Sequence, residues 1–158
     1  MIYSKTCEYA LRALSYLAST EKGTLTMIPE VSRKTGVPAP YIAKVFQSLV
    51  RSGILESQRG PTGGFAFKRP PETITLFEII QMVDDVTAFV NQCVMGLDRC
   101  SSANACPLHF IWTRTKKQIL NKLRASTFKQ VTKKIGKVKY RELKRARLNE
   151  ALQLSVCK

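Results

Sequence analysis

The chain has 158 residues, 44% of them hydrophobic, and its 26 Lys and Arg outnumber 11 Asp and Glu to give a formal charge of +15. This size predicts one compact domain with at most an appended helix, and the positive charge favours nucleic acid over an anionic membrane surface as the partner. Charged residues interrupt every apolar run, so neither a membrane-spanning helix nor a signal peptide is expected.

The N-terminal part of the chain predicts three helices. Apolar residues three and four apart predict a mostly buried helix over residues 4–20, with Ser4 as its N-cap. Thr26 is expected to cap a short second helix that ends at Gly36. After a proline-containing turn, residues 41–53 keep helical spacing with one apolar face. Two short helices joined by such a turn are typical of a helix-turn-helix, whose second helix enters the DNA major groove.

A β-hairpin is predicted directly after the third helix. Residues 54–59 and 65–69 read as two short strands, joined by the tip Gly60-Pro-Thr-Gly-Gly64. A hairpin in this place is the wing of a winged helix, and its basic residues are Arg59, Lys68 and Arg69. A nucleotide-binding phosphate loop is excluded because no Gly-Lys-Ser/Thr follows the glycines and no helix begins there.

Five side chains are the candidates for DNA contact. They are Tyr41, Lys44, Gln47 and Arg51 on the exposed face of the third helix, and Arg59 at the wing. We expect the lysine and the arginines to contact phosphates rather than bases.

Residues 75–83 predict another helix, with Thr75 as N-cap and Glu78 completing a capping box. Asp84 and Asp85 are expected to lead directly into a cysteine-rich loop.

Residues 93–109 contain three of the five cysteines and the only histidine, with the spacing Cys-x6-Cys-x5-Cys-x2-His. The intervening Gly, Asp, Ser and Asn residues are typical of a loop, and a loop with thiolate and imidazole donors can fold around a soft or borderline metal centre. The close Cys-x2-4-Cys pair of structural zinc sites is missing from this stretch, so zinc is not the first expectation. Without an export signal we expect a cytoplasmic protein whose thiols stay reduced, with no disulfide framework.

A long amphipathic helix is predicted over residues 107–125. Its apolar side includes Ile111 and Trp112, while Lys116 and Lys117 are expected on its polar side. We interpret it as a homodimerisation helix, since dimers match the two-fold half-sites that helix-turn-helix proteins read; a plain core helix is the alternative. The Lys- and Arg-rich residues beyond it predict either a solvated basic tail or a segment that contacts phosphates without sequence selectivity.

Residues 1–125 resemble the winged-helix transcription regulators that include IscR, NsrR, RirA and CymR, in their cluster-binding branch. The motifs that carry the resemblance are Tyr9-Ala-Leu-Arg-Ala-Leu14, Thr35-Gly-Val-Pro38 with Tyr41-Ile42, Ser52-Gly-Ile-Leu55, Arg59-Gly-Pro-Thr-Gly-Gly-Phe65, Pro70-Pro-Glu-Thr-Ile-Thr-Leu76 and the cysteine stretch. The resemblance implies a homodimeric DNA-binding transcription factor.

The same resemblance implies a 2Fe–2S or 4Fe–4S cluster. Its cysteine ligands fall on Cys93, Cys100 and Cys106. The fourth ligand falls on His109 by analogy with IscR-like members, or on Glu8 of the first helix, supplied by the partner subunit, by analogy with NsrR-like members. We favour His109, because imidazole is the more ordinary ligand. Cys7 and Glu8 are otherwise expected to be surface residues, with Cys7 an outside candidate for the same role.

The predicted fold is mainly α with a small β-wing: a winged helix-turn-helix followed by a long C-terminal dimerisation helix. The predicted divisions are residues 1–83 for the DNA-binding domain, 84–106 for the cysteine-rich loop, 107–128 for the dimerisation helix and 129–158 for the basic tail.

The predicted function is a transcriptional regulator, expected to repress, that senses iron–sulfur status, nitric oxide or redox state through the cluster. The alternative is a cluster-free regulator that acts as a thiol redox switch or a zinc-site sensor. We do not expect an enzyme, because the single histidine has neither paired carboxylates nor a nucleophile near it in sequence.

Overall fold

The computed structural model describes residues 3–135, which are mainly helical with one two-stranded antiparallel sheet. In chain order the elements are α1 (Lys5–Leu17), α2 (Ile28–Thr35), α3 (Ala39–Arg51), β1 (Leu55–Gln58), β2 (Gly64–Phe67), α4 (Leu76–Val83), α5 (Val86–Asn91), a 3-10 turn (Ser102–Asn104), α6 (His109–Ala125) and α7 (Phe128–Ile135). The predicted winged helix-turn-helix is confirmed. Most of the predicted basic tail lies outside the described residues.

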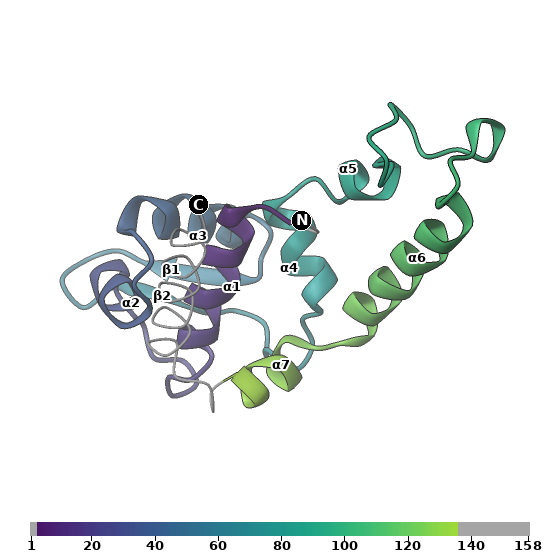
Figure 1. Cartoon of the computed structure of the whole chain (residues 1–158). Helices are drawn as coiled ribbons and strands as arrows, with labels where there is room; N and C mark the ends of the chain where they lie inside the picture. Colours follow the sequence, from purple (N-terminus) through teal and green to yellow (C-terminus); the bar gives the residue numbers. More distant parts are fainter. Residues whose placement is uncertain (1–2, 136–158) are drawn as a thin grey trace, which may run out of the picture.

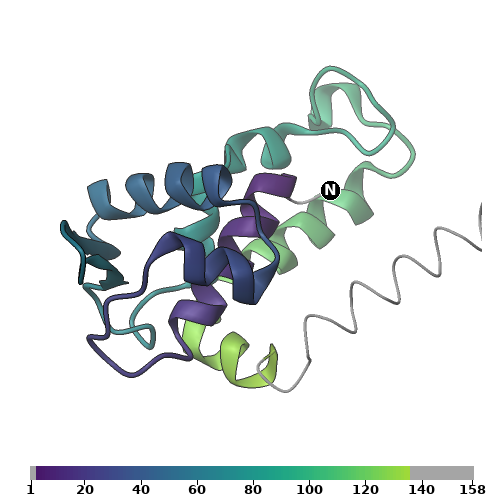
Figure 2. The same ribbon diagram turned by 90° about the vertical axis from the view of Figure 1, so that its left-hand side faces the viewer.

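The two ends of the molecule are well separated. In Figure 1, α2, α3 and the β-hairpin lie at one end, while α5, the loop after it and the start of α6 lie at the other. Figure 2 shows the same separation from the side, with the hairpin and the loop at opposite edges of the view.

Local capping explains where several helices begin and end. The Ser4 hydroxyl accepts a hydrogen bond from the Cys7 N–H (3.2 Å), and the Thr75 hydroxyl accepts one from the Glu78 N–H (3.1 Å), so both predicted N-caps are confirmed. Gly36 ends α2 with φ +69°, the left-handed conformation that glycine adopts without steric cost.

The prediction that Thr26 caps α2 is wrong. Met27 occupies the N-cap position, and no side chain caps this helix. The backbone of Thr26 instead exchanges two hydrogen bonds of 3.0 Å with Phe65 of β2. Residue 26 therefore extends the edge of the wing, which fixes its backbone in an extended conformation before the helix begins.

The core forms where α1–α4, the base of the wing and α7 meet. Its largest fully buried side chains include Leu14, Ile42, Phe46, Leu49, Ile74, Ile79 and Phe128. Burial of an aliphatic or aromatic side chain contributes about 1.5–3 kcal/mol, so this cluster supplies most of the stability of the DNA-binding end.

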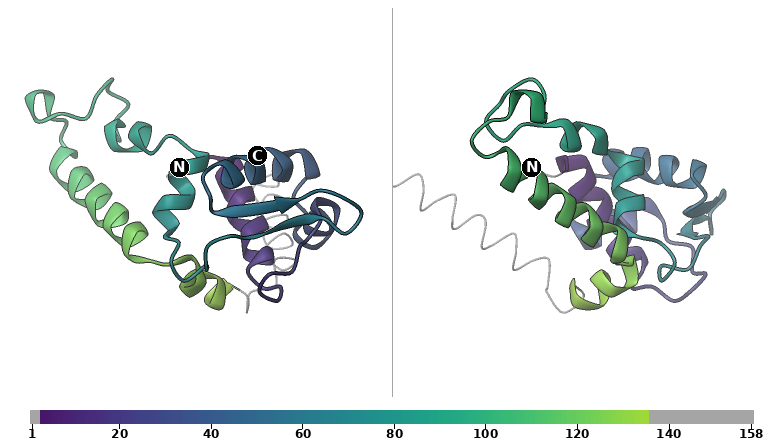
Figure 3. Two further views of the ribbon diagram at one scale, coloured as in Figure 1. Left: turned by 180° about the vertical axis from the view of Figure 1, so that it is seen from behind. Right: turned by 90° about the vertical axis from the view of Figure 1, so that its right-hand side faces the viewer.

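The wing pairs β1 with β2 in the register Leu55↔Phe67 to Gln58↔Gly64. Its tip needs glycine, because a Cβ on Gly63 would lie 2.2 Å from the Gln58 carbonyl oxygen. Figure 3 (left) shows the two strands side by side, joined at one end by the loop that forms this tip.

Two helices were not predicted from the sequence. α5 interrupts the expected direct path from Asp85 into the loop, and its six residues are too few for a periodic pattern to be recognised. α7 follows α6 because the chain returns to the DNA-binding domain: Thr127 forms a β-bridge with Thr75, and Phe128 is buried in the core. Within residues 3–135, no helix is long and apolar enough to cross a membrane.

Candidate metal centre and nucleic-acid interface

The cysteine loop joins the end of α5 to the start of α6. Cys93, Cys106 and His109 are buried and Cys100 is half-buried, while residues 94–99 between the first two cysteines are exposed. The backbone is closed at both sides of the loop: the Cys100 N–H donates to the Asn91 carbonyl (3.0 Å), and the His109 N–H donates to the Cys106 carbonyl (2.9 Å). The loop is thus closed by backbone hydrogen bonds at both sides, and three of its four candidate ligands are buried.

The four predicted ligands meet as two pairs. The Cys93 and Cys106 sulfurs lie 3.8 Å apart, and the Cys100 sulfur lies 3.5 Å from His109 Nδ1. The described residues contain no group of three or more His, Cys, Asp or Glu side chains placed to hold one metal ion. The four donors therefore do not converge on a single point.

Each pair has the separation of two ligands on one tetrahedral metal ion. Metal–sulfur bonds of about 2.3 Å and metal–nitrogen bonds of about 2.0 Å place two thiolates about 3.8 Å apart and a thiolate and an imidazole about 3.5 Å apart. A disulfide would require about 2.05 Å between the sulfurs, so the Cys93–Cys106 pair is a pair of free thiols. The donor set of three thiols and one imidazole fits an iron–sulfur cluster or another soft metal centre.

The environment of His109 suits a ligand role. Its Nδ1 faces Cys100, while its Nε2 lies 3.4 Å from the Ser102 hydroxyl. Histidine ligands usually hold their second nitrogen against a polar group, which orients the ring. Ser102 was missed in the sequence analysis, because nothing in the spacing shows that the 3-10 turn returns this hydroxyl to the imidazole.

Hydrogen bonding lowers the pKa of the Cys93 thiol. The largest cause is the N–H of Met95, and further contributions come from the Leu97 N–H, the Cys106 thiol and the positive charge of Lys116, against the opposing effect of burial. A lowered pKa favours the thiolate, the form that binds metals and reacts with oxidants.

The expected position of Lys116 on α6 was also wrong. It was expected on the polar side of α6, but it is 5% exposed, and its Nζ donates to the carbonyls of Val90 (2.6 Å) and Gln92 (3.2 Å). The signal was present in the sequence: Lys116 follows Trp112 by four residues and precedes Ile119 by three, which places it within the apolar face of the helix.

The two alternative ligand candidates of α1 lie in different surroundings. The Glu8 carboxylate forms ion pairs with Lys5 (2.7 Å) and Arg12 (2.8 Å). Cys7 is fully buried, which corrects the expectation that it lies on the surface. Burial, with a smaller effect from the Asp84 carboxylate, raises the pKa of Cys7 to about 12, so this thiol stays protonated at neutral pH.

The five predicted DNA-contact residues are all exposed. Lys44, Gln47 and Arg51 succeed one another at three- and four-residue intervals along α3, so their side chains share a face of the helix. Tyr41 lies near the start of α3, where its ring packs edge-on against Tyr9 of α1 (5.4 Å between centroids). Arg59 follows β1 at the hairpin tip. This surface presents cations and polar groups at the positions where a winged helix meets DNA.

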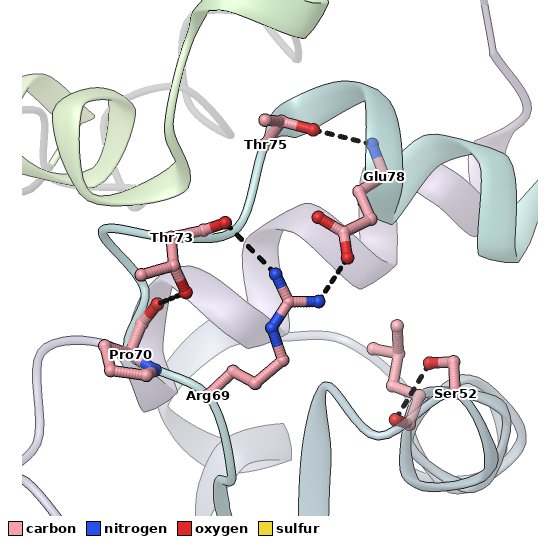
Figure 4. A network of polar contacts seen from close by, with 7 residues as sticks. Ser52, Arg69, Pro70, Thr73, Thr75 and Glu78 are labelled. Atoms are coloured by element: carbon pink, nitrogen blue, oxygen red, sulfur yellow. Dashed lines mark hydrogen bonds and ion pairs between the residues drawn. The ribbon is translucent and has the colours of Figure 1, made fainter.

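Arg69 belongs to a structural network rather than to that surface. It forms an ion pair with Glu78 of α4 and donates to the Thr73 carbonyl (3.1 Å), as Figure 4 shows together with the Thr75 cap. The base of the wing is thereby tied to α4, and of the three basic wing residues Arg59 and Lys68 remain on the exposed surface.

Apolar residues at the start of α6, in the cysteine loop and at the end of α5 are exposed. Phe110 is 78% and Ile111 66% exposed, and Val90, Val94, Met95, Leu97 and Leu108 are also exposed large hydrophobic residues. The opposite side of α6 contacts α4. A surface of this kind in one subunit is typical of an interaction site.

The chain matches a family of known proteins over residues 3–134, the Rrf2 family, described as iron-dependent transcriptional regulators. It is 34% identical over 133 residues to a protein of Aquifex aeolicus named among HTH-type transcriptional regulators, covering 83% of this chain and 91% of that protein. It is also 38% identical over 79 residues to the transcriptional regulator IscR of Cereibacter sphaeroides, covering 49% of this chain and 51% of IscR.

Two solved structures share the fold at low sequence identity. T. potens IscR aligns with a TM-score of 0.65 at 21% identity, over 83% of this chain and 85% of that one. The oxidised form of Staphylococcus aureus CymR aligns with a TM-score of 0.66 at 19% identity, over 84% of this chain and 96% of that one. With the helix-turn-helix, the wing and the family match in agreement, the chain belongs to the Rrf2 family of DNA-binding transcriptional regulators.

Proposed function

We propose that this protein is a transcriptional repressor whose DNA binding depends on an iron–sulfur cluster held by Cys93, Cys100, Cys106 and His109. The observation that carries the proposal is the two-pair arrangement: Cys93 with Cys106 at 3.8 Å, and Cys100 with His109 at 3.5 Å, within one loop. Two pairs match a centre with two metal positions, each taking two protein ligands, and this favours 2Fe–2S over 4Fe–4S.

The arrangement also supports His109 over Glu8 as the fourth ligand. His109 is already beside Cys100 and is oriented by Ser102. Glu8 lies in two ion pairs on α1, with Lys5 and Arg12. Recruitment of Glu8 by a partner subunit would require breaking these contacts, whereas His109 is delivered by the loop itself.

When bound, the cluster would supply a centre that responds to iron supply, nitric oxide or oxidants. The chain's own residues connect that centre to the DNA-binding end. The loop leads into α6, and α6 leads through Thr127, which bridges to Thr75, into Phe128 of the core. A change in the loop can alter DNA affinity only to the extent that the two states of the loop favour different placements of α6.

We further propose that α6 mediates homodimerisation. The support is the exposed apolar surface formed by Phe110, Ile111 and their neighbours in the loop. A dimer would place two α3 helices on two half-sites, with Lys44, Arg51 and Arg59 contacting phosphates and Tyr41 and Gln47 close to the bases. Such an arrangement links the loop, which adjoins the dimer surface, to the spacing of the recognition helices.

The test is the absorption spectrum of anaerobically purified protein from 300 to 700 nm, beside iron and sulfide assays. We expect thiolate-to-iron bands and equal iron and sulfide content near two per chain, which is the content of a 2Fe–2S cluster. Substitution of Cys93, Cys100 or Cys106 by Ala should abolish the bands, while Cys7→Ala should keep them. Protein that stays colourless after reconstitution with iron and sulfide would contradict the proposal that the loop binds a cluster.

A second candidate is a thiol redox switch on the same scaffold. The Cys93 and Cys106 thiols are buried side by side, and the pKa of Cys93 is lowered. A peroxide would accept two electrons and two protons from this pair, which would form one disulfide and release water. Colourless protein in which peroxide forms a Cys93–Cys106 disulfide, detected by mass spectrometry, would favour this candidate over the cluster.

A further inference from the structure

Two side chains of α6 hold the peptide that carries Cys93. Trp112 Nε1 donates to the Gln92 carbonyl (2.9 Å), and Lys116 Nζ donates to the same oxygen (3.2 Å) and to the Val90 carbonyl (2.6 Å). We call this set of contacts the Trp112–Lys116 latch. The two side chains lie four residues apart and so share one face of α6.

The latch satisfies groups that would otherwise be unpaired. Val90 and Gln92 lie at the C-terminal end of α5, where carbonyl groups lack partners within the helix and favour a cation. Lys116 as a residue is only 5% exposed, so its ammonium needs these acceptors to offset the loss of water. The Trp112 ring adds apolar contact, since it packs edge-on against Phe89 of α5 (6.1 Å between centroids).

The geometry connects the latch to the candidate ligands. The Gln92 carbonyl and the Cys93 nitrogen belong to one planar peptide group. Holding the carbonyl oxygen in place therefore also positions the backbone nitrogen of Cys93. At the other end of the loop, the Cys106 carbonyl accepts a hydrogen bond from the N–H of His109, the first residue of α6. Both members of the Cys93–Cys106 pair are thereby attached to the same helix.

We propose that Trp112 and Lys116 are positioning residues that keep Cys93 beside Cys106 before any metal binds. The proposal rests on the proposed function only in taking Cys93 as a ligand. Because the latch would already hold Cys93 in place, metal binding would not carry the entropic cost of ordering this cysteine. The latch should therefore raise metal affinity without contributing a ligand.

The test measures alkylation of each cysteine by iodoacetamide in reduced, metal-free protein with a chelator present, resolved by peptide mass spectrometry. Lys116→Met removes an ammonium that also helps to keep the Cys93 pKa low, so each rate is divided by the thiolate fraction found from its own pH dependence. The rate of the Cys93 thiolate corrected in this way should rise roughly tenfold or more, because a buried charge-assisted contact is lost. Cys100 and Cys7 should keep their rates. Lys117→Met is the matched control, since Lys117 is exposed on the same helix, and it should change no rate. Lys116→Arg, which keeps the charge and the donors, should restore slow alkylation.

Trp112→Phe tests the same contact without removing a charge. It keeps an aromatic ring against Phe89 and deletes only the N–H donor, so Cys93 alkylation should rise by a smaller factor, roughly threefold. This variant decides the matter if Lys116→Met fails to fold. Unchanged Cys93 rates, or equal increases at Cys93, Cys100 and Cys7, would overturn the positioning role. Because no metal or DNA is present, this outcome is independent of whether the protein holds a cluster.

Discussion

The DNA-binding end and the cysteine-loop end of this protein are stabilised by different means. At the DNA-binding end, α1–α4 bury a continuous set of apolar side chains centred on residues such as Leu14 and Phe46. At the loop end, most of the contacts described above are polar: the Trp112–Lys116 latch, the two donor pairs and the backbone hydrogen bonds that close the loop, with the Trp112–Phe89 ring contact as the apolar addition. The recognition surface therefore rests on a packed core that keeps it folded, whereas the loop depends on specific contacts that a bound group can change.

The greatest change in the free energy of unfolding is expected when a buried aromatic residue is truncated, and an exposed aromatic residue provides the comparison. Phe46 is fully buried between α3 and the rest of the core, so Phe46→Ala should lower the free energy of unfolding by about 3–5 kcal/mol. Phe110→Ala, at a residue 78% exposed, should change it by about 0.5 kcal/mol or less in the monomer. Urea unfolding followed by far-UV circular dichroism measures both.

Protein concentration supplies the control for this pair of variants. If α6 mediates dimerisation, Phe110→Ala should reduce only the concentration-dependent part of the unfolding midpoint. Equal, concentration-independent losses for Phe46→Ala and Phe110→Ala would contradict the distinction between the two ends.

A second prediction concerns how the buried Cys7 thiol of α1 makes stability depend on pH. Burial raises the pKa of Cys7 to about 12 in the folded protein, against 9.0 for a free thiol. The unfolded chain therefore releases this proton first, and stability is lost as the pH rises above about 9. At pH 10.5 the loss due to Cys7 should be about 2 kcal/mol relative to pH 8.

The matched variant is Cys7→Ala. It should lower stability at pH 8 by removing buried atoms, but stability should then fall less steeply between pH 8 and 10.5 than in the unaltered protein. Parallel pH profiles for the two proteins would show that the Cys7 thiol does not remain protonated in the folded state.

The smallest effects are expected at the DNA surface. Lys44→Ala and Arg51→Ala should each weaken DNA binding by less than roughly tenfold and reduce the slope of log affinity against log salt by about 0.9 per subunit. Gln47→Ala should leave the slope unchanged and reduce discrimination between sequences. Lys22→Ala, at an exposed residue of the loop between α1 and α2, is the control. Fluorescence anisotropy over a range of salt concentrations measures these quantities. A salt slope in Lys44→Ala equal to that of the unaltered protein would show that Lys44 does not contact a phosphate.

The difference between the two ends also decided what could be predicted from sequence. The winged helix was predictable because its caps, turn glycines and apolar periodicity are local signals, as at Ser4, Gly36 and Thr75. The candidate ligands were predictable from their spacing. Their grouping in pairs was not, because it depends on how the loop folds back between two helices.

Other features depended on contacts distant in sequence. Thr26 has the chemistry of a helix cap, but its pairing with Phe65 takes precedence. Lys116 was assigned to the polar face by its charge alone, although its position in the helical repeat falls between Trp112 and Ile119. The Val90 carbonyl, which accepts a hydrogen bond from the buried Lys116 ammonium, belongs to α5. This helix is too short to be recognised in the sequence.

We infer that the state of the loop sets DNA affinity while the DNA-binding end stays folded. The most direct test is the affinity of cluster-loaded, chelator-treated and Cys93→Ala protein for a DNA site recovered by selection from random sequence. We predict that the loaded protein differs from the treated protein by at least about fivefold, that Cys93→Ala matches the treated protein, and that all three have the same helical content. Equal affinities for the selected site in all three preparations would contradict the claim.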